Sequence, residues 1–205
     1  MPIITKIQSQ KKRAGFYNIF VDGTFFCSLS DLQLATLGLK NNQDISKKEL
    51  SDIKNSSALS KTYDRALYYL QYGPRTVSQM QKYLLQKDFD EDVVQLTIER
   101  LIKDGYLNDL NYCLSFISTR QQLRPRSSMV LKKELLAKDI NKDIIEQAIS
   151  ESEDVDNNLA IKKIIDKKIK QSKYQDKNKM LQYLSQQGFS YSEAKNALDE
   201  ISFWQ

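Results

Sequence analysis

The chain has 205 residues, of which 40% are hydrophobic and 28% charged, and its formal net charge at pH 7 is +5. This balance is typical of a folded soluble protein, excludes a largely disordered one and is basic enough to suit a polyanionic partner. The chain has no histidine, no glycine-rich phosphate loop, no paired-cysteine metal motif and no nucleophile elbow, so we expect neither an enzyme nor a metal or cofactor site. Catalysis by lysine or by carboxylates stays open, although no spacing in the chain suggests it.

The first part of the chain predicts a small antiparallel sheet. β-Branched residues indicate a strand over 3–8, which a basic loop follows. Asp22-Gly23 separates two aromatic and β-branched runs, 16–21 and 24–28, and this dipeptide suits a tight turn in which both central residues have positive φ. We therefore expect a β-hairpin over 16–28.

Short helices should complete this module, which we place at residues 1–57. Ser30 can cap a helix over 31–37, and Gly38 is placed to end it. The next expected segments are a polar loop, a second helix and a linker, at 41–46, 47–55 and 56–57.

Pairs of helix-capping residues recur in one register through the rest of the chain. Each pair is 14 residues apart, and successive pairs begin 51 and 49 residues apart. The pairs are Thr76 and Asp90, Ser127 and Asn141, and Asp176 and Ser190, all of which have a side-chain oxygen that can accept from a free helix amide. Apolar residues keep step with these caps in four columns: Met80, Leu131 and Met180; Leu84, Leu135 and Leu184; Phe89, Ile140 and Phe189; Ile98, Ile149 and Leu198.

This register predicts three repeats of three helices each, at 61–107, 108–153 and 154–205. In the first repeat the expected helices cover 62–71, 76–87 and 90–103. The second repeat should open at Asn108 or Asp109 and the third near Asp156, with Trp204 packing against the last helix. The predicted fold is mainly α, with the three tandem repeats in an elongated curved array behind the N-terminal β-hairpin module. Such an array offers a surface rather than one deep pocket, which favours binding over chemistry.

The expected location is the cytoplasm. The first residues lack the apolar core of a signal peptide, and no stretch approaches the ~18 uncharged apolar residues of a membrane span. The two cysteines, Cys27 and Cys113, lie in unrelated segments and are expected to be buried and reduced.

Several runs of residues resemble the bacterial regulatory protein RecX family. The most specific is Gly-Tyr-Leu-Asn-Asp at 105–109, followed by Tyr112 and Phe116. Further similar runs are Arg-Ala-Leu-Tyr-Tyr-Leu at 65–70, Gly-Pro-Arg-Thr at 73–76, Leu-Leu-Gln-Lys-Asp-Phe-Asp at 84–90 and Leu-Leu-Ala-Lys-Asp-Ile at 135–140. The resemblance extends over essentially the whole chain and is weakest from 154 to 205.

The resemblance implies a modulator, usually an inhibitor, of the RecA recombinase. Such a protein would lie in the groove of the RecA–DNA filament and block strand exchange, ATP turnover and LexA co-protease activity. The resemblance implies no catalytic activity and no cofactor. It implies that contact with DNA is weak or made through the filament. An array in a groove needs no dimer, so a monomer is expected. The chain departs from the family pattern where Asp88 and Asp139 replace a usual glycine at a left-handed position, and where Arg124 precedes Pro125.

The candidate binding residues are basic and stand near the repeat junctions or in the first loop. Arginine around one break suits phosphate or carboxylate pairing, and lysines at 163, 167 and 170 would share one helix face. The candidates are Lys11, Lys12, Arg13, Arg75, Arg120, Arg124, Arg126, Lys132, Lys133, Lys163, Lys167 and Lys170. For each of them a merely solvated surface is the alternative.

Two further alternatives stay open. Tyr68, Tyr69 and Tyr72 could stack bases, although a partly buried aromatic face is the more frequent explanation for such tyrosines. Three-helix modules are also common in helix-turn-helix proteins that act directly on DNA. Against that function, no predicted helix gathers the Arg, Asn and Gln side chains of a base-reading helix.

Overall fold

The computed structural model describes residues 1–153 and 155–201, so that Trp204 lies outside the described residues. The chain divides into two compact units. One contains Met1–Gly73 and Met80–Tyr106, and the other contains Pro74–Gln79 and Leu107–Gln205.

The first unit begins with a four-stranded antiparallel sheet in the order β3-β2-β1-β4. Its strands are β1 (Ile3–Ser9), β2 (Phe16–Val21), β3 (Thr24–Ser30) and β4 (Gln43–Asp44). The predicted hairpin is confirmed, with φ of 48° at Asp22 and 81° at Gly23 in its turn. The loop predicted over 41–46 was wrong in part, because it contains the short strand β4, which pairs with β1.

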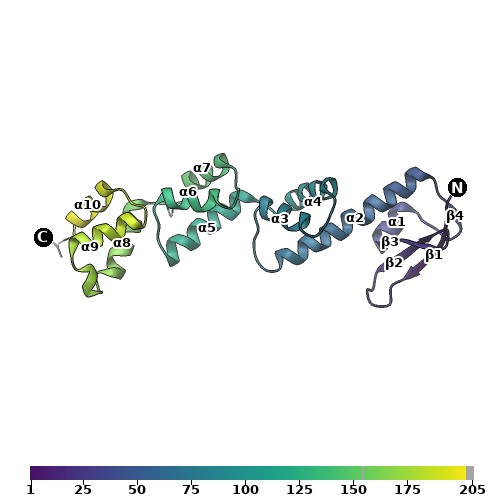
Figure 1. Ribbon diagram of the computed structural model, residues 1–205, viewed down its shortest axis with the longest axis horizontal. Helices are drawn as coiled ribbons and strands as arrows, with labels where there is room; N and C mark the ends of the chain where they lie inside the picture. The colour runs from purple at the N-terminus through teal and green to yellow at the C-terminus, as the bar shows by residue number, and fades with distance from the viewer. Residues whose placement is uncertain (154, 202–205) are drawn as a thin grey trace. The chain divides into compact units, whose positions relative to one another are not determined.

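Two helices cover this sheet (Figure 1). Helix α1 (Asp31–Leu37) begins with a capping box at Ser30 and ends at Gly38, as predicted. Helix α2 (Lys47–Leu70) packs Ile53 against the buried side chains of the sheet, which are Ile4, Ile19, Val21, Cys27 and Leu29.

The linker predicted at Ser56-Ser57 was wrong, because α2 continues through it. The Ser57 hydroxyl is buried and donates to the carbonyl of Ser28 at 2.7 Å. Ser56 accepts from the Gln33 side-chain amide at 2.8 Å through its carbonyl. The two serines therefore join α2 to the sheet and to α1, and the same helix continues into the first repeat.

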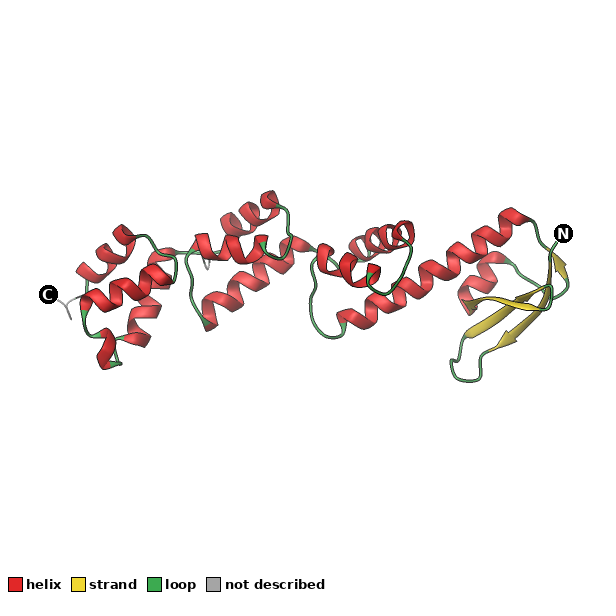
Figure 2. Cartoon of the chain, in the orientation of Figure 1, coloured by secondary structure: helices red, strands yellow, loops and turns green. Residues whose placement is uncertain are grey.

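Beyond the sheet, the described residues form helices joined by loops (Figure 2). The first repeat uses the end of α2 together with α3 (Val77–Leu85) and α4 (Glu91–Lys103). The second contains α5 (Asp109–Leu123), α6 (Ser128–Leu136) and α7 (Lys142–Glu151). The third contains α8 (Asn157–Lys168), α9 (Lys177–Gln186) and α10 (Tyr191–Asp199), with a short 3-10 helix, η1 (Ser172–Tyr174), that the sequence did not predict.

The predicted apolar columns form the cores of these repeats. Ten of the twelve column residues are buried, and the remaining two, Phe89 and Ile149, are partly buried. Separate clusters fill the second repeat, around Leu131 and Leu135, and the third, around Met180 and Leu184. The second and third repeats thus each have a hydrophobic core of their own, which is why the same spacing recurs along the chain.

The predicted caps stand at the helix starts, with one difference. Thr76, Ser127, Asn141, Asp176 and Ser190 each accept a hydrogen bond from an amide of the helix that follows. Asp90 also precedes its helix, but its side chain makes no capping hydrogen bond. The left-handed positions are confirmed by φ values of 60° at Asp88 and 56° at Asp139.

Within the described part of the chain, none of the helices has the length and apolar character that a membrane span requires. Cys27 and Cys113 are both free and buried, as expected. Burial raises the pKa of both thiols, that of Cys113 to about 11 with a smaller contribution from the nearby Asp109 carboxylate.

Candidate nucleic-acid interface

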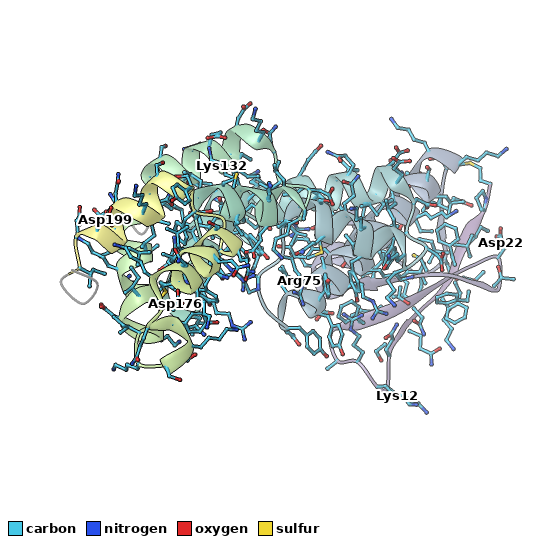
Figure 3. The ribbon with its side chains drawn as sticks, turned by 60° about the vertical axis from the view of Figure 1, so that its left-hand side comes forward. Lys12, Asp22, Arg75, Lys132, Asp176 and Asp199 are labelled. Atoms are coloured by element: carbon cyan, nitrogen blue, oxygen red, sulfur yellow. The ribbon has the colours of Figure 1, made fainter. Side chains whose placement is uncertain are left out.

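The loop between β1 and β2 carries two exposed lysines and one engaged arginine. Lys11 and Lys12 are exposed, and Lys12 points away from the body of the unit in Figure 3. Arg13 instead forms an ion pair with Asp64 of α2, at 2.6 Å between Nη2 and Oδ2. Its guanidinium also lies 3.5 Å from the centre of the Phe16 ring. Arg13 therefore fastens the base of the loop, while the two lysines remain available for a partner.

The tyrosines of α2 separate into two groups. Tyr69 stacks on Tyr83 of α3 with ring centres 3.8 Å apart, so it belongs to the packing of the repeat. Tyr68 and Tyr72 are 48% and 65% exposed, and their hydroxyls lie 2.6 Å apart. The prediction of a partly buried aromatic face therefore holds for Tyr69 only.

Arg120 is held by a carboxylate of its own repeat. Its Nε and Nη2 atoms donate to the two oxygens of Glu134 on α6, at 2.8 and 2.6 Å. This bidentate pair raises the pKa of Arg120, chiefly through the hydrogen bond. Arg120 thus points to Glu134, so the structure does not bring all three predicted arginines of this break to one free surface.

Lys132 and Lys133 lie on α6, and among the described residues only the first of them is paired with a carboxylate. The Lys132 ammonium forms an ion pair with Glu146 of α7 at 2.6 Å. Lys133 is exposed.

The junction between the second and third repeats is built on the start of α6. The Ser127 amide donates to the Gln187 carbonyl at 3.4 Å, and the Ser128 amide donates to Oδ1 of Asn157 at 3.0 Å. Arg126 adds a hydrogen bond from Nη1 to the Gln187 side chain, and its Nε atom is buried with no acceptor among the described residues. These contacts bring the α5–α6 connection against α8 and α9.

A similar junction occurs one repeat earlier, within the same unit. The Thr76 hydroxyl donates to the Lys138 carbonyl at 3.4 Å, and the Val77 amide donates to Oδ1 of Asp109 at 2.9 Å. Arg75 occupies the position equivalent to Arg126, and its Nε atom is also buried. The candidates Arg75 and Arg126 therefore take part in the packing of the junctions, and each is only partly exposed to solvent.

The second junction contains a hollow of about 370 Å³ between the repeats. Arg124 and Arg126 line it from the α5–α6 connection, while Lys163, Lys167 and Lys168 line it from α8. Leu123, Pro125, Ile164, Tyr183 and Gln187 complete the lining. Four of the predicted candidates thus meet in one place, although they are 37 or more residues apart across the two repeats.

Two details of the lysine face differ from the prediction. Lys170 lies beyond the end of α8, which stops at Lys168, so it does not share the helix face of Lys163 and Lys167. Lys168, which the prediction left out, takes its place in the hollow and lies 5.0 Å from the centre of the Tyr183 ring. Its position, 12 residues after the cap Asp156, matches that of Arg120 after Asn108, and this repeat equivalence was the sequence signal for it.

The described residues contain no group of three or more His, Cys, Asp or Glu side chains that could hold a metal ion. What the candidate residues share is positive charge and hydrogen-bond donors, which is the chemistry of phosphate or carboxylate binding.

Comparison with known proteins decides the family. Three family models match in chain order: the regulatory protein RecX N-terminal domain at residues 2–46, the RecX first three-helix domain at 63–101 and the RecX second three-helix domain at 108–149. The chain is 30% identical to the regulatory protein RecX of Leuconostoc mesenteroides, over 98% of this chain and 76% of that protein. It is also 30% identical to that of Bacillus subtilis, over 99% of this chain and 78% of that protein.

The chain belongs to the RecX family. A crystal structure of a regulatory protein RecX is similar over 98% of this chain and 100% of that one, with a TM-score of 0.74 and 27% identity. The crystal structure of RecX from Lactobacillus salivarius is similar over 70% of this chain and 96% of that one, with a TM-score of 0.57 and 28% identity. These RecX relatives are named regulatory proteins rather than enzymes. The resemblance inferred from the sequence is therefore confirmed, and so is the fold of an N-terminal sheet followed by three-helix repeats.

Proposed function

We propose that this RecX-family chain regulates RecA by binding in the groove of the RecA–DNA filament, and that it acts mainly as an inhibitor. The observation that carries this proposal is the similarity to RecX regulatory proteins along nearly the whole chain, from the sheet module through the helical repeats. An inhibitor of this kind needs no active site of its own. It has only to occupy the groove, and it would thereby reduce strand exchange, ATP hydrolysis and LexA co-protease activity in the SOS response.

The repeats supply a suitable surface for such binding. The second and third repeats each have their own core, and exposed side chains on successive repeats can contact a regular polymer at several points. We assign Lys11, Lys12, Lys133 and the cations of the second junction to this contact; Arg124, Lys163 and Lys167 are the exposed cations of that junction. The proposal includes an extended monomeric array in the cytoplasm, and small-angle X-ray scattering would test both the extension and the monomeric state.

Titration of the chain into RecA, single-stranded DNA and ATP tests the proposal, with ATP hydrolysis as the readout. We expect a dose-dependent fall in hydrolysis when the chain is present at far fewer copies than RecA. Adding more single-stranded DNA should not restore the rate, because the target is the filament.

The alternative is a helix-turn-helix type of protein that acts on DNA directly. The cationic hollow at the second junction is the observation that favours it. In that case hydrolysis would fall only when the chain has covered the free DNA, and extra DNA would restore it. That result would overturn the filament proposal.

A further inference from the structure

The hollow at the second junction gathers positive charge that its own lining does not neutralise. Five of its ten lining residues are arginine or lysine, and none of the ten is acidic. Like charges gathered in one concave site repel each other and draw in counter-ions, so such a site favours an anionic ligand. Leu123, Ile164 and Tyr183 add apolar surface, which lowers the local polarity and strengthens that preference.

The equivalent side chains of the second repeat show that the charge is specific to this junction. Arg120 and Lys168 hold the same position in their repeats, and so do Glu134 and Tyr183, each seven residues after its helix cap. In the second repeat the cation is paired with the Glu134 carboxylate. In the third, a tyrosine replaces that carboxylate, and Lys168 lies over the rings of Tyr183 and Tyr174 at 5.0 and 5.1 Å. An aromatic ring attracts the ammonium but leaves its charge in place for a ligand.

We propose that this hollow binds the phosphodiester backbone of a nucleic-acid strand. Arg124 offers a planar fork of donors to phosphate oxygens from the α5–α6 connection, and Lys163 and Lys167 face the strand from successive turns of α8.

The basic surface also continues past the hollow. Lys170 and Lys173 are exposed in the segment that follows α8. A ligand with a charge at every unit fits such a run of cations better than the scattered carboxylates of an acidic protein surface. This is the reason for choosing a nucleic-acid strand over an acidic protein as the ligand.

The test measures binding of the full chain to a fluorescent oligothymidylate by anisotropy, at several salt concentrations and without RecA. Thymidylate presents the backbone with little base stacking of its own. The site variant is Lys163→Ala/Lys167→Ala. The matched control, Lys179→Ala/Lys195→Ala, removes the same charge from exposed lysines of the same repeat that do not line the hollow. A third variant, Tyr183→Glu, places beside Lys168 the carboxylate that the second repeat has at Glu134.

Loss of two phosphate contacts should reduce the slope of log K against log salt by about 1.4, which corresponds to about 25-fold weaker binding at ~0.1 M salt. The control should stay within about twofold of the parent chain, and Tyr183→Glu should weaken binding with no change in helicity. Equal losses in the site and control variants would show that only net charge matters and would overturn the proposal. Competition by polyglutamate as effective as that by unlabelled oligothymidylate would overturn it in favour of an acidic protein ligand.

This inference refines the proposed function but is tested separately from it. The binding assay contains no RecA, and the hydrolysis assay can show inhibition by a chain whose hollow has lost its lysines. Either idea can therefore fail while the other stands.

Discussion

Replacing Gly188 with alanine should loosen the junction between the second and third repeats. Gly188 has φ of 91°, and a Cβ atom there would overlap Cγ2 of Val130 and lie 2.6 Å from the Ser127 hydroxyl. The backbone strain costs about 1 kcal/mol, because side chains disfavour this region. Overpacking of a close contact adds about 1–3 kcal/mol. Together the substitution should cost about 2–4 kcal/mol in the stability of the third repeat.

Hydrogen exchange followed by mass spectrometry would measure this loss where it occurs. A cost of about 2–4 kcal/mol corresponds to exchange about 30- to 1,000-fold faster in peptides from α8, α9 and α10. The sheet and α1 should exchange as before, since repeats stabilise chiefly themselves and their neighbours. Gly105→Ala is the matched control, because Gly105 has φ of 78° and no atom within 4 Å of the added Cβ. It should pay the backbone cost of about 1 kcal/mol alone.

A second substitution identifies the steric part of the effect. Val130→Ala removes the methyl group that the new Cβ would overlap, so it should recover at least about 1 kcal/mol in the Gly188→Ala background. If Gly188→Ala costs no more than Gly105→Ala, or if Val130→Ala gives no recovery, the close approach of the two repeats at this glycine is refuted.

Three further predictions concern caps, an ion pair and a buried thiol. Asp176→Ala should lower the free energy of unfolding in urea by about 1 kcal/mol, because the Asp176 carboxylate accepts from two helix amides. Asp90→Ala should lower it clearly less, because Asp90 makes no such hydrogen bond. Equal losses in the two variants would contradict this. Glu134→Gln should lower the free energy of unfolding by about 1–2 kcal/mol, because it weakens the pair with Arg120. A double-mutant cycle with Arg120→Ala should show that the two losses in stability are not additive. Additive losses would exclude a coupling between these side chains. Burial raises the pKa of the Cys113 thiol to about 11, so the native state keeps a proton that the unfolded chain releases near pH 9. The free energy of unfolding should therefore be constant below pH ~9 and fall by at most about 1.4 kcal/mol per pH unit up to pH ~11. Cys113→Ala should reduce that fall in denaturant titrations at these pH values.

Local signals in the sequence predicted most of the secondary structure. Caps, turn dipeptides and apolar spacing act over a few residues, which is why Ser30, Asp22-Gly23 and the recurring pairs after Thr76 could be interpreted directly. Asp88 and Asp139, in contrast, were identified as left-handed positions through the family resemblance, since a glycine is usual there.

Tertiary contacts explain where those local signals were misleading. Ser56 and Ser57 suggest a linker by composition, yet they lie within α2 because partners on β3 and α1 satisfy their polar groups. The strand β4 has only two residues, and its pairing with β1 decides its structure, so no pattern of its own could reveal it.

The candidate site shows the same limit more sharply. Their position around one break identified Arg120, Arg124 and Arg126 together as candidates. It could not show that Glu134 pairs with Arg120 while Arg124 stays exposed. That Arg124 and Lys163 line one hollow depends on how the third repeat docks on α6. The docking in turn depends on single atoms at Ser128 and Gly188, which leave no periodic trace in the sequence.

Co-sedimentation with RecA filaments tests the central claim most directly. RecA is assembled on single-stranded DNA with a slowly hydrolysed ATP analogue, at a salt concentration where this chain no longer binds bare DNA. If the chain is a filament-groove regulator, it should pellet saturably with the filaments and remain in the supernatant with DNA alone or with RecA alone. A chain that stays in the supernatant in the presence of intact filaments would contradict the account.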